Sequence, residues 1–129
     1  MSVNAAESKA VIERYLHTLS GHAKTPELVA SFVSDPSLAD HIRDVEAAFP
    51  QYELITEGLI AERDVVAVRG VFRGVQRGPF AGIPATGRSV SAALMIFYRV
   101  EGSRIVQHWL QFDGASLVAQ LQQASAAHA

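Results

Sequence analysis

Apolar residues in the first fifty positions recur every three or four residues, which is the period of an amphipathic helix. A first helix is predicted between the capping residue Asn4 and Gly21, with a buried stripe at Val11, Ile12, Tyr15, Leu16 and Leu19. Thr25-Pro26 and Asp35-Pro36 each place a capping residue before a proline, and they predict two further helices. The third helix ends before Pro50, because proline disfavours helical geometry in the preceding residue.

After Pro50 the pattern becomes that of β-strands. Strands are predicted over Tyr52–Ala61, Val65–Gln76, Arg88–Val100 and Arg104–Asp113. Gly78–Gly87 reads as a loop, Ala115–Gln123 as a last helix, and the Ala/Ser-rich tail after it is expected to fray. Three helices followed by a four-stranded antiparallel meander predict an α+β fold, with the helices on one face of the sheet.

Composition limits the class of protein. The 129 residues are 49% hydrophobic, which predicts one domain, 1–129, with a sizeable core. The absence of cysteine excludes disulfides and thiolate chemistry and fits a reducing compartment. No uncharged apolar run approaches the ~20 residues of a membrane helix. Met1–Ala10 does not resemble a signal peptide, because Glu7 and Lys9 precede any apolar run. We therefore expect a soluble, cytoplasmic protein that does not contact a membrane.

Charge is distributed unevenly along the chain. Residues 1–64 carry 11 acids and 5 bases, whereas residues 65–129 carry 6 arginines and only Glu101 and Asp113 as acids. Arg69, Arg73 and Arg77 share one strand face and could contact phosphates. The net charge of -2 favours solvent-facing arginines, or partners of the acids in the first half, so no nucleic-acid partner is expected.

Metal and phosphate sites are weakly indicated. Asp40, His41 and Asp44 could converge on one helical face, but no two histidines show the i, i+4 spacing of a helical zinc site, and a solvated surface is favoured. In the glycine-rich loop, Pro79 and Pro84 lack the backbone N–H groups that cradle a phosphate. We therefore expect no metal and no anion site there.

The last predicted strand carries most of the candidate chemistry. By the two-residue period, one face holds Trp109, Gln111 and Asp113, and the other holds His108, Leu110 and Phe112. A bulge would break this rule and could bring His108 towards Asp113. His108 is either a catalyst or a core histidine with satisfied hydrogen bonds, and Tyr15 is either core or a hydroxyl that points into a pocket.

Asp113 has two competing interpretations. At a strand end beside a large aromatic side chain it would be partly desolvated, which raises a carboxyl pKa and suits general acid–base catalysis. Alternatively, Asp-Gly-Ala-Ser before an apolar helix is an ordinary capping sequence, and the pattern alone slightly favours this reading. Of the two acids in residues 65–129, Glu101 falls in a predicted hairpin turn, where an exposed charge is expected. Asp113 is therefore the one whose position suggests a specific role.

Several segments together resemble a known family. They are AFPQYEL (48–54), EGLIAERDVVAVRG (57–70), GPFAGIPATGR (78–88), RIVQHWLQFD (104–113) and SLVAQL (116–121). In this order they cover nearly the whole chain, which resembles the SnoaL-like polyketide cyclases, also called ester cyclases. The resemblance implies a nuclear-transport-factor-2-like fold: a cone-shaped, curved antiparallel sheet packed against N-terminal helices, with a short C-terminal helix, a pocket and dimerisation through sheet faces.

The resemblance also implies a site. Characterised cyclases of the family use an Asp as general acid/base in an intramolecular aldol closure of a polyketide ester, without metal or cofactor. By motif this carboxylate maps to Asp113, and His108 and Trp109 match the family's HW pair. Gln76 stands where relatives often carry a histidine, and His41 is the candidate for an Asp-His element after the second helix. The expected substrate-binding residues are Tyr15, His41, Phe49, Gln76, Trp109 and Gln111, with Phe97 or Tyr98.

Two functions are consistent with this sequence. The first is an enzyme that acts on a small hydrophobic or aromatic carbonyl compound, with Asp113 moving the proton and Gln76, Gln111 or His108 stabilising the oxyanion. The second is a non-catalytic binder of small hydrophobic ligands, since this scaffold hosts isomerases, dehydratases, hydrolases and binders alike.

Overall fold

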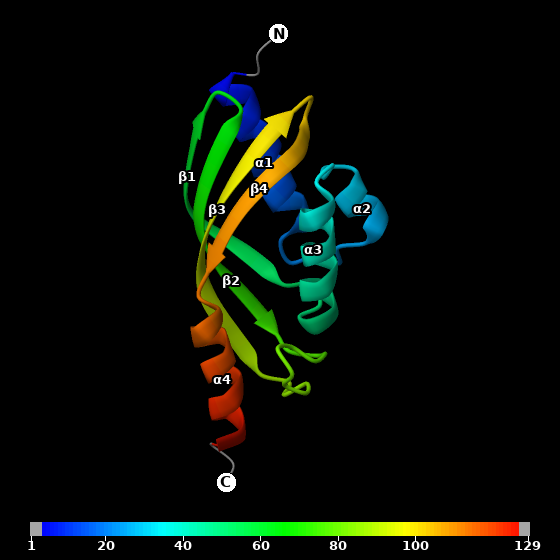
Figure 1. Cartoon of the computed structure of the whole chain (residues 1–129), viewed down its shortest axis with the longest axis vertical. Helices are drawn as coiled ribbons and strands as arrows, with labels where there is room; N and C mark the ends of the chain where they lie inside the picture. The colour runs from blue at the N-terminus through cyan, green and yellow to red at the C-terminus, as the bar shows by residue number, and fades with distance from the viewer. Residues whose placement is uncertain (1–3, 127–129) are drawn as a thin grey trace.

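A computed structural model describes residues 4–126. It contains helices α1 (Ala5–Leu19), α2 (Pro26–Ala30) and α3 (Pro36–Ala48), strands β1 (Glu53–Glu62), β2 (Val65–Val75), β3 (Ser89–Glu101) and β4 (Arg104–Phe112), and helix α4 (Gly114–Ala126). The strands form one antiparallel sheet in the order β1-β2-β3-β4. Figure 1 shows α1, α2 and α3 on one side of this sheet, with the chain ends at opposite ends of the long axis. The predicted α+β fold is confirmed.

Local capping explains where the first three helices begin. Asn4 Oδ1 accepts the Glu7 backbone N–H at 2.8 Å, and Thr25 Oγ1 accepts that of Leu28 at 3.2 Å. Asp35 Oδ1 accepts the Ser37 N–H at 3.0 Å. Each cap satisfies an N–H group that the first helical turn leaves without a partner. The predicted starts of the three helices are therefore confirmed.

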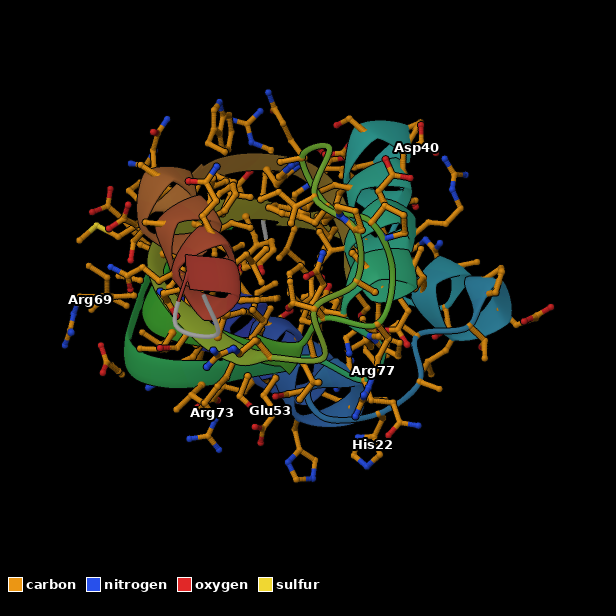
Figure 2. All side chains as sticks on the ribbon, turned by 90° about the horizontal axis from the view of Figure 1, so that it is seen from below. His22, Asp40, Glu53, Arg69, Arg73 and Arg77 are labelled. Atoms are coloured by element: carbon orange, nitrogen blue, oxygen red, sulfur yellow. The ribbon has the colours of Figure 1, made fainter. Side chains whose placement is uncertain are left out.

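The alternation of burial along β3 defines the two faces of the sheet. Every second residue is buried on the inner face, namely Val90, Ala92, Leu94, Ile96, Tyr98 and Val100. These side chains pack in one core with the apolar stripe of α1, which includes Ile12 and Leu16. Figure 2 looks along the long axis and shows the sheet curving around the interior, with α3 opposite it. The concave face is therefore the inner wall of the molecule.

A bulge decides which residues of β4 face inward. Val100 pairs with Ile105, but the next pair is Arg99 with Gln107, so Val106 is an extra residue in β4. From there on, His108 lies opposite Tyr98 on the inner face, and Trp109 lies on the outer face. Without the extra residue the two faces would be exchanged, because a one-residue shift moves every side chain to the opposite face.

The C-terminal helix is longer than predicted. It spans Gly114–Ala126 instead of Ala115–Gln123, and Leu117 and Leu121 anchor it in the core. The expected frayed tail is therefore helical as far as residue 126, and residues 127–129 lie outside the described part of the chain. Within residues 4–126, none of the helices is both long and apolar enough to cross a membrane.

Candidate functional site

A cavity lies between the concave face of the sheet and helices α1, α3 and α4. The cavity itself is small, about 80 Å³, and it is partly open to solvent; twelve of its sixteen lining residues are leucine, isoleucine, valine or phenylalanine. Its polar lining residues are His41 and the chain's three tyrosines, Tyr15, Tyr52 and Tyr98. A mostly apolar cavity with a few polar groups is the usual form of a site for small hydrophobic ligands.

The tyrosines supply neutral hydrogen-bond donors. The rings of Tyr15 and Tyr98 meet edge to face with centroids 5.6 Å apart. Burial raises the pKa of both phenols and of Tyr52 well above the ordinary value. All three hydroxyls therefore keep their protons at neutral pH and can donate hydrogen bonds to an oxygen in the cavity.

A histidine–carboxylate pair lies beside this wall. His108 Nδ1 is 2.8 Å from Asp35 Oδ2, and both side chains are largely buried. Burial alone would raise the pKa of Asp35, but hydrogen bonds from His108, Ser37 and the Leu38 backbone outweigh it and hold the pKa below its ordinary value. The ionised carboxylate can only accept, so Nδ1 carries a proton, and this leaves Nε2 as the nitrogen of His108 that can exchange a proton with a ligand.

His41 brings a second imidazole into the cavity wall. It lies on α3, and burial lowers its pKa, as does its proximity to His108, against an opposing effect of Asp44. His41 is therefore neutral at neutral pH. The arrangement combines a buried carboxylate, two imidazoles and three phenols, which can move and share protons without a metal.

Sequence reasoning missed Asp35 as a site residue. Asp35 is recognisable before Pro36 as a helix cap, and its Oδ1 does cap α3. Its second oxygen contacts a residue 73 positions later in the chain, which local patterns do not reveal. The inward direction of His108, set by the bulge, was the missing information.

Asp113 lies outside the cavity. It is exposed at the start of α4, where its Oδ1 accepts the Ser116 N–H at 3.0 Å. The expected partial desolvation is wrong, and the capping interpretation is right, because the strand has already ended and the carboxylate turns back to the helix. Asp113 instead borders a groove on the outer side of the sheet that includes Glu57 and Arg69. The possible approach of His108 to Asp113 is also wrong, since His108 is paired with Asp35.

Trp109 and Gln111 also point away from the cavity. Both are exposed, and Trp109 retains 45% of its accessible surface and packs near the Arg99 guanidinium, 5.9 Å from the ring centroid. Their predicted place in the pocket is wrong, because the bulge turns these positions outward. Of the alternatives Phe97 and Tyr98, Tyr98 lines the cavity, and Phe97 lies on the outer face.

Gln76 is fully buried, and its side chain forms hydrogen bonds with the backbone of the loop that follows it. Its Nε2 donates to the carbonyls of Gly78 at 3.0 Å and Ile83 at 2.9 Å, and its Oε1 accepts the Thr86 N–H at 3.0 Å. These bonds occupy the amide, so the expectation that Gln76 stabilises an oxyanion is wrong. Tyr15, His41 and Phe49, by contrast, do lie in the cavity wall.

The charged surface residues pair with each other. Arg69 Nη1 lies 2.9 Å from Glu57 Oε1, and Arg73 Nη2 lies 3.1 Å from Glu53 Oε1, so these arginines pair with acids of the neighbouring strand. Figure 2 shows Arg69, Arg73 and Glu53 pointing outward from the body. Asp40 and Asp44 both pair with the exposed Arg43 on α3, which is the solvated helix surface favoured by the sequence.

The fold and cavity define an α+β protein with a mostly apolar, partly open site on the concave side of a curved sheet. The chain belongs to the SnoaL-like polyketide cyclase family, whose sequence model matches residues 8–121. The resemblance seen in the sequence is confirmed, and the fold is the nuclear-transport-factor-2-like fold. No match is found among curated proteins.

Several solved structures share this fold. AclR, a proposed hydroxylase from Streptomyces galilaeus, superposes with a TM-score of 0.79 at 22% identity, over 93% of this chain and 83% of AclR. TsrD from Streptomyces laurentii has a TM-score of 0.71 at 26% identity, over 88% of this chain and 96% of TsrD. A SnoaL-like polyketide cyclase from Agrobacterium tumefaciens has a TM-score of 0.71 at 22% identity, over 88% and 97% of the two chains.

Proposed function

We propose that this protein binds a small hydrophobic or aromatic carbonyl compound and catalyses cofactor-free proton transfer at the carbon beside the carbonyl, as in an aldol-type ring closure. The observation that carries the proposal is the Asp35–His108 pair beside an apolar cavity lined by three tyrosines and His41. Apolar walls favour a hydrophobic substrate. Family membership supports a polyketide-like carbonyl compound as the substrate class.

In the proposed mechanism His108 is the base. Its Nε2 takes a proton from the carbon next to a carbonyl, and the C–H electrons move onto the carbonyl oxygen. The resulting enolate carbon attacks a second carbonyl of the same molecule, and His108 returns the proton to the new alkoxide. Asp35 is a positioning residue: it accepts the Nδ1–H and stabilises the imidazolium that forms.

The tyrosine pair is proposed to stabilise the enolate. Tyr98 lies opposite His108 on the adjacent strand, and the Tyr15 ring packs edge to face against Tyr98. Neutral phenols in an apolar wall are strong donors to a developing negative charge. His41, as a cavity-lining neutral imidazole, would hold the second carbonyl. These residues take the place of Gln76 and Gln111 in the role expected from the sequence.

Proton exchange tests this proposal without the natural substrate. The probe is 2-acetonaphthone in D₂O, with loss of its methyl proton signal followed by NMR. We expect the protein to accelerate exchange and the His108→Gln variant to lose roughly 10²–10⁴-fold of that acceleration. Asp113→Asn is the matched control and should retain the wild-type rate. Loss of exchange in Asp113→Asn with a normal rate in His108→Gln would instead support the assignment of Asp113 as the base.

A non-catalytic binding role is the second candidate. It is favoured by one observation: the cavity wall is almost wholly apolar, and His108 lies beside its lining residues and not among them. A binder would show saturable binding of 2-acetonaphthone, with exchange no faster than in buffer. The same NMR titration distinguishes the two functions.

We also propose that the protein is a homodimer joined through the outer face of the sheet. Ile60, Ala67, Phe97 and Trp109 are consecutive partners across the four strands and form an apolar row on that face. Ile60 is 74% exposed and Phe97 is 50% exposed, and Met95 beside them is 58% exposed. A contiguous exposed apolar patch is typical of an association surface. Family resemblance favours a second copy of this chain as the partner.

A further inference from the structure

The segment between β2 and β3 places one aromatic ring against the cavity. Residues 76–88 form a loop, and Figure 1 shows it at the lower end of the sheet, between α4 and the end of α3. Phe80 in this loop lines the cavity together with Phe49 from the end of α3. The two rings meet edge to face, with centroids 5.3 Å apart and planes at 65°.

The base of the loop is fixed by buried hydrogen bonds. The Gln76 side chain bridges Gly78, Ile83 and Thr86 as described above. The backbone N–H of Arg77 donates to the Ala48 carbonyl at 2.8 Å, which ties the loop to the end of α3. The three Gln76 contacts are partly shielded from water, where breaking a hydrogen bond leaves a costly unpaired group.

The tip of the loop is a tight two-residue turn. Phe80 and Ile83 exchange both backbone hydrogen bonds, at 2.8 and 2.9 Å. Between them Ala81 and Gly82 both have positive φ, at 50° and 78°, which is the geometry of a two-residue hairpin. The paired backbone fixes the direction of the Phe80 Cα–Cβ bond relative to the turn.

We infer that Phe80 determines the size of the ligand that the cavity accepts. The paired backbone of the turn fixes the direction of the Phe80 Cα–Cβ bond, and the ring packs edge to face on Phe49, so turning the ring out of the cavity would lose this ring contact. A ligand long enough to reach Phe80 would have to displace it, whereas a shorter ligand would pack against it. This inference rests on the proposal that the cavity binds the substrate, and it does not depend on the identity of the catalytic base.

Binding of a graded series of neutral aromatic ketones tests the inference. The probes are acetophenone, 2-acetonaphthone and 2-acetylanthracene, with dissociation constants measured by equilibrium dialysis. In the Phe80→Ala variant we expect the preference for the three-ring over the one-ring ketone to rise about tenfold or more. Phe80→Leu should shift it less. Ile83→Ala is the matched control, because Ile83 is in the same turn but is not a lining residue of the cavity.

The possible outcomes separate this inference from the proposed function. A size preference that shifts in Phe80→Ala and stays at the wild-type value in Ile83→Ala supports it. Binding by the wild type with the same preference in all three variants overturns the size role of Phe80 alone. An equal shift in Ile83→Ala also overturns it, because loop loosening would then explain the change. Failure of the wild type to bind any of the three ketones overturns both the inference and the proposed function.

Discussion

At the scale of single residues, Asp35 links helix capping to the candidate chemistry. Its two carboxylate oxygens have different partners: Oδ1 accepts hydrogen bonds from Ser37 and Leu38, and Oδ2 accepts one from His108. This carboxylate therefore starts α3 and also fixes the tautomer of an inward-facing histidine on β4. Removal of its charge should affect both the stability of the fold and the orientation of His108.

We predict that Asp35→Asn lowers the free energy of unfolding by about 1–3 kcal/mol at pH 7, because the largely buried His108 loses its charged acceptor. The folded-state pKa of Asp35 is below its ordinary value, so its stabilising effect is complete above that value and is lost as the pH falls through the folded pKa. The difference from wild type should therefore shrink below about pH 4.

Urea unfolding between pH 3 and pH 7 measures this difference. Asp44→Asn on the exposed side of α3 is the control, and it should cost little at any pH. An Asp35→Asn deficit that is equally large at all pH values would show that the carboxylate's charge is not what stabilises the fold.

Asp113 caps helix α4, and this structural role can be tested by stability alone. Because its Oδ1 caps α4, Asp113→Ala should destabilise the protein by about 1 kcal/mol, whereas Asp113→Asn should be close to neutral, since asparagine caps equally well. Thermal unfolding of the two variants makes this comparison. An alanine variant as stable as wild type would contradict the capping role.

At the scale of elements, the loop between β2 and β3 depends on one buried amide. Gln76→Leu removes the partners of two carbonyls and one N–H group, which should cost about 2 kcal/mol and increase amide hydrogen exchange within residues 78–87. Gln111→Leu, on the exposed outer face, is the matched control. Unchanged exchange in the loop of Gln76→Leu would show that other contacts hold it.

The sequence predicts elements whose determinants are local. The starts of α1, α2 and α3 follow from Asn4, Thr25 and Asp35, because a cap and its N–H partner lie within three residues of each other. The β-rich composition of residues 89–101 likewise identifies a strand, although its continuous apolar run from Leu94 to Tyr98 does not show which face is buried.

Which face of β4 points inward depends on the register of its pairing with β3, and the sequence of β4 alone does not reveal this register. Period-two alternation groups His108 with Leu110 and Phe112, but the inserted Val106 decides that this group, and not Trp109, faces the cavity. The two-residue period alone puts His108 and Trp109 on opposite sides of the sheet, and the bulge decides that His108 is the one that faces inward. Tyr15 lies in the cavity wall as its place on the apolar face of the first helix indicates, whereas the helical pattern favoured a solvated position for His41, and only the family resemblance pointed to the pocket where His41 lies.

At the scale of the whole molecule, the two faces of the sheet have different roles in this account. The concave face forms the cavity, and the convex face presents the apolar row that is proposed to join two copies. The strand ion pairs of Arg69 and Arg73 lie on that convex side, and their partners are strand acids and not helix acids. The charge imbalance between the halves of the sequence is thus partly neutralised within the sheet.

We predict that Phe97→Glu converts a dimer into a folded monomer, because a charge in the centre of the apolar row would be buried on association. Sedimentation velocity measures the mass, and circular dichroism checks that the fold is kept. His17→Glu on the exposed side of α1 is the control and should remain dimeric. A wild-type protein that sediments as a monomer at high concentration would contradict the proposed interface.

The central claim is that ligand chemistry takes place on the concave side, at His41 and His108, and not at Trp109 and Asp113. NMR titration of the full-length protein with 2-acetonaphthone tests it most directly, with the imidazole and indole signals as reporters. The account predicts saturable shifts of the His41 and His108 imidazole signals and an unchanged Trp109 indole N–H signal. Shifts confined to Trp109 and the backbone around Asp113, with unperturbed histidines, would contradict it.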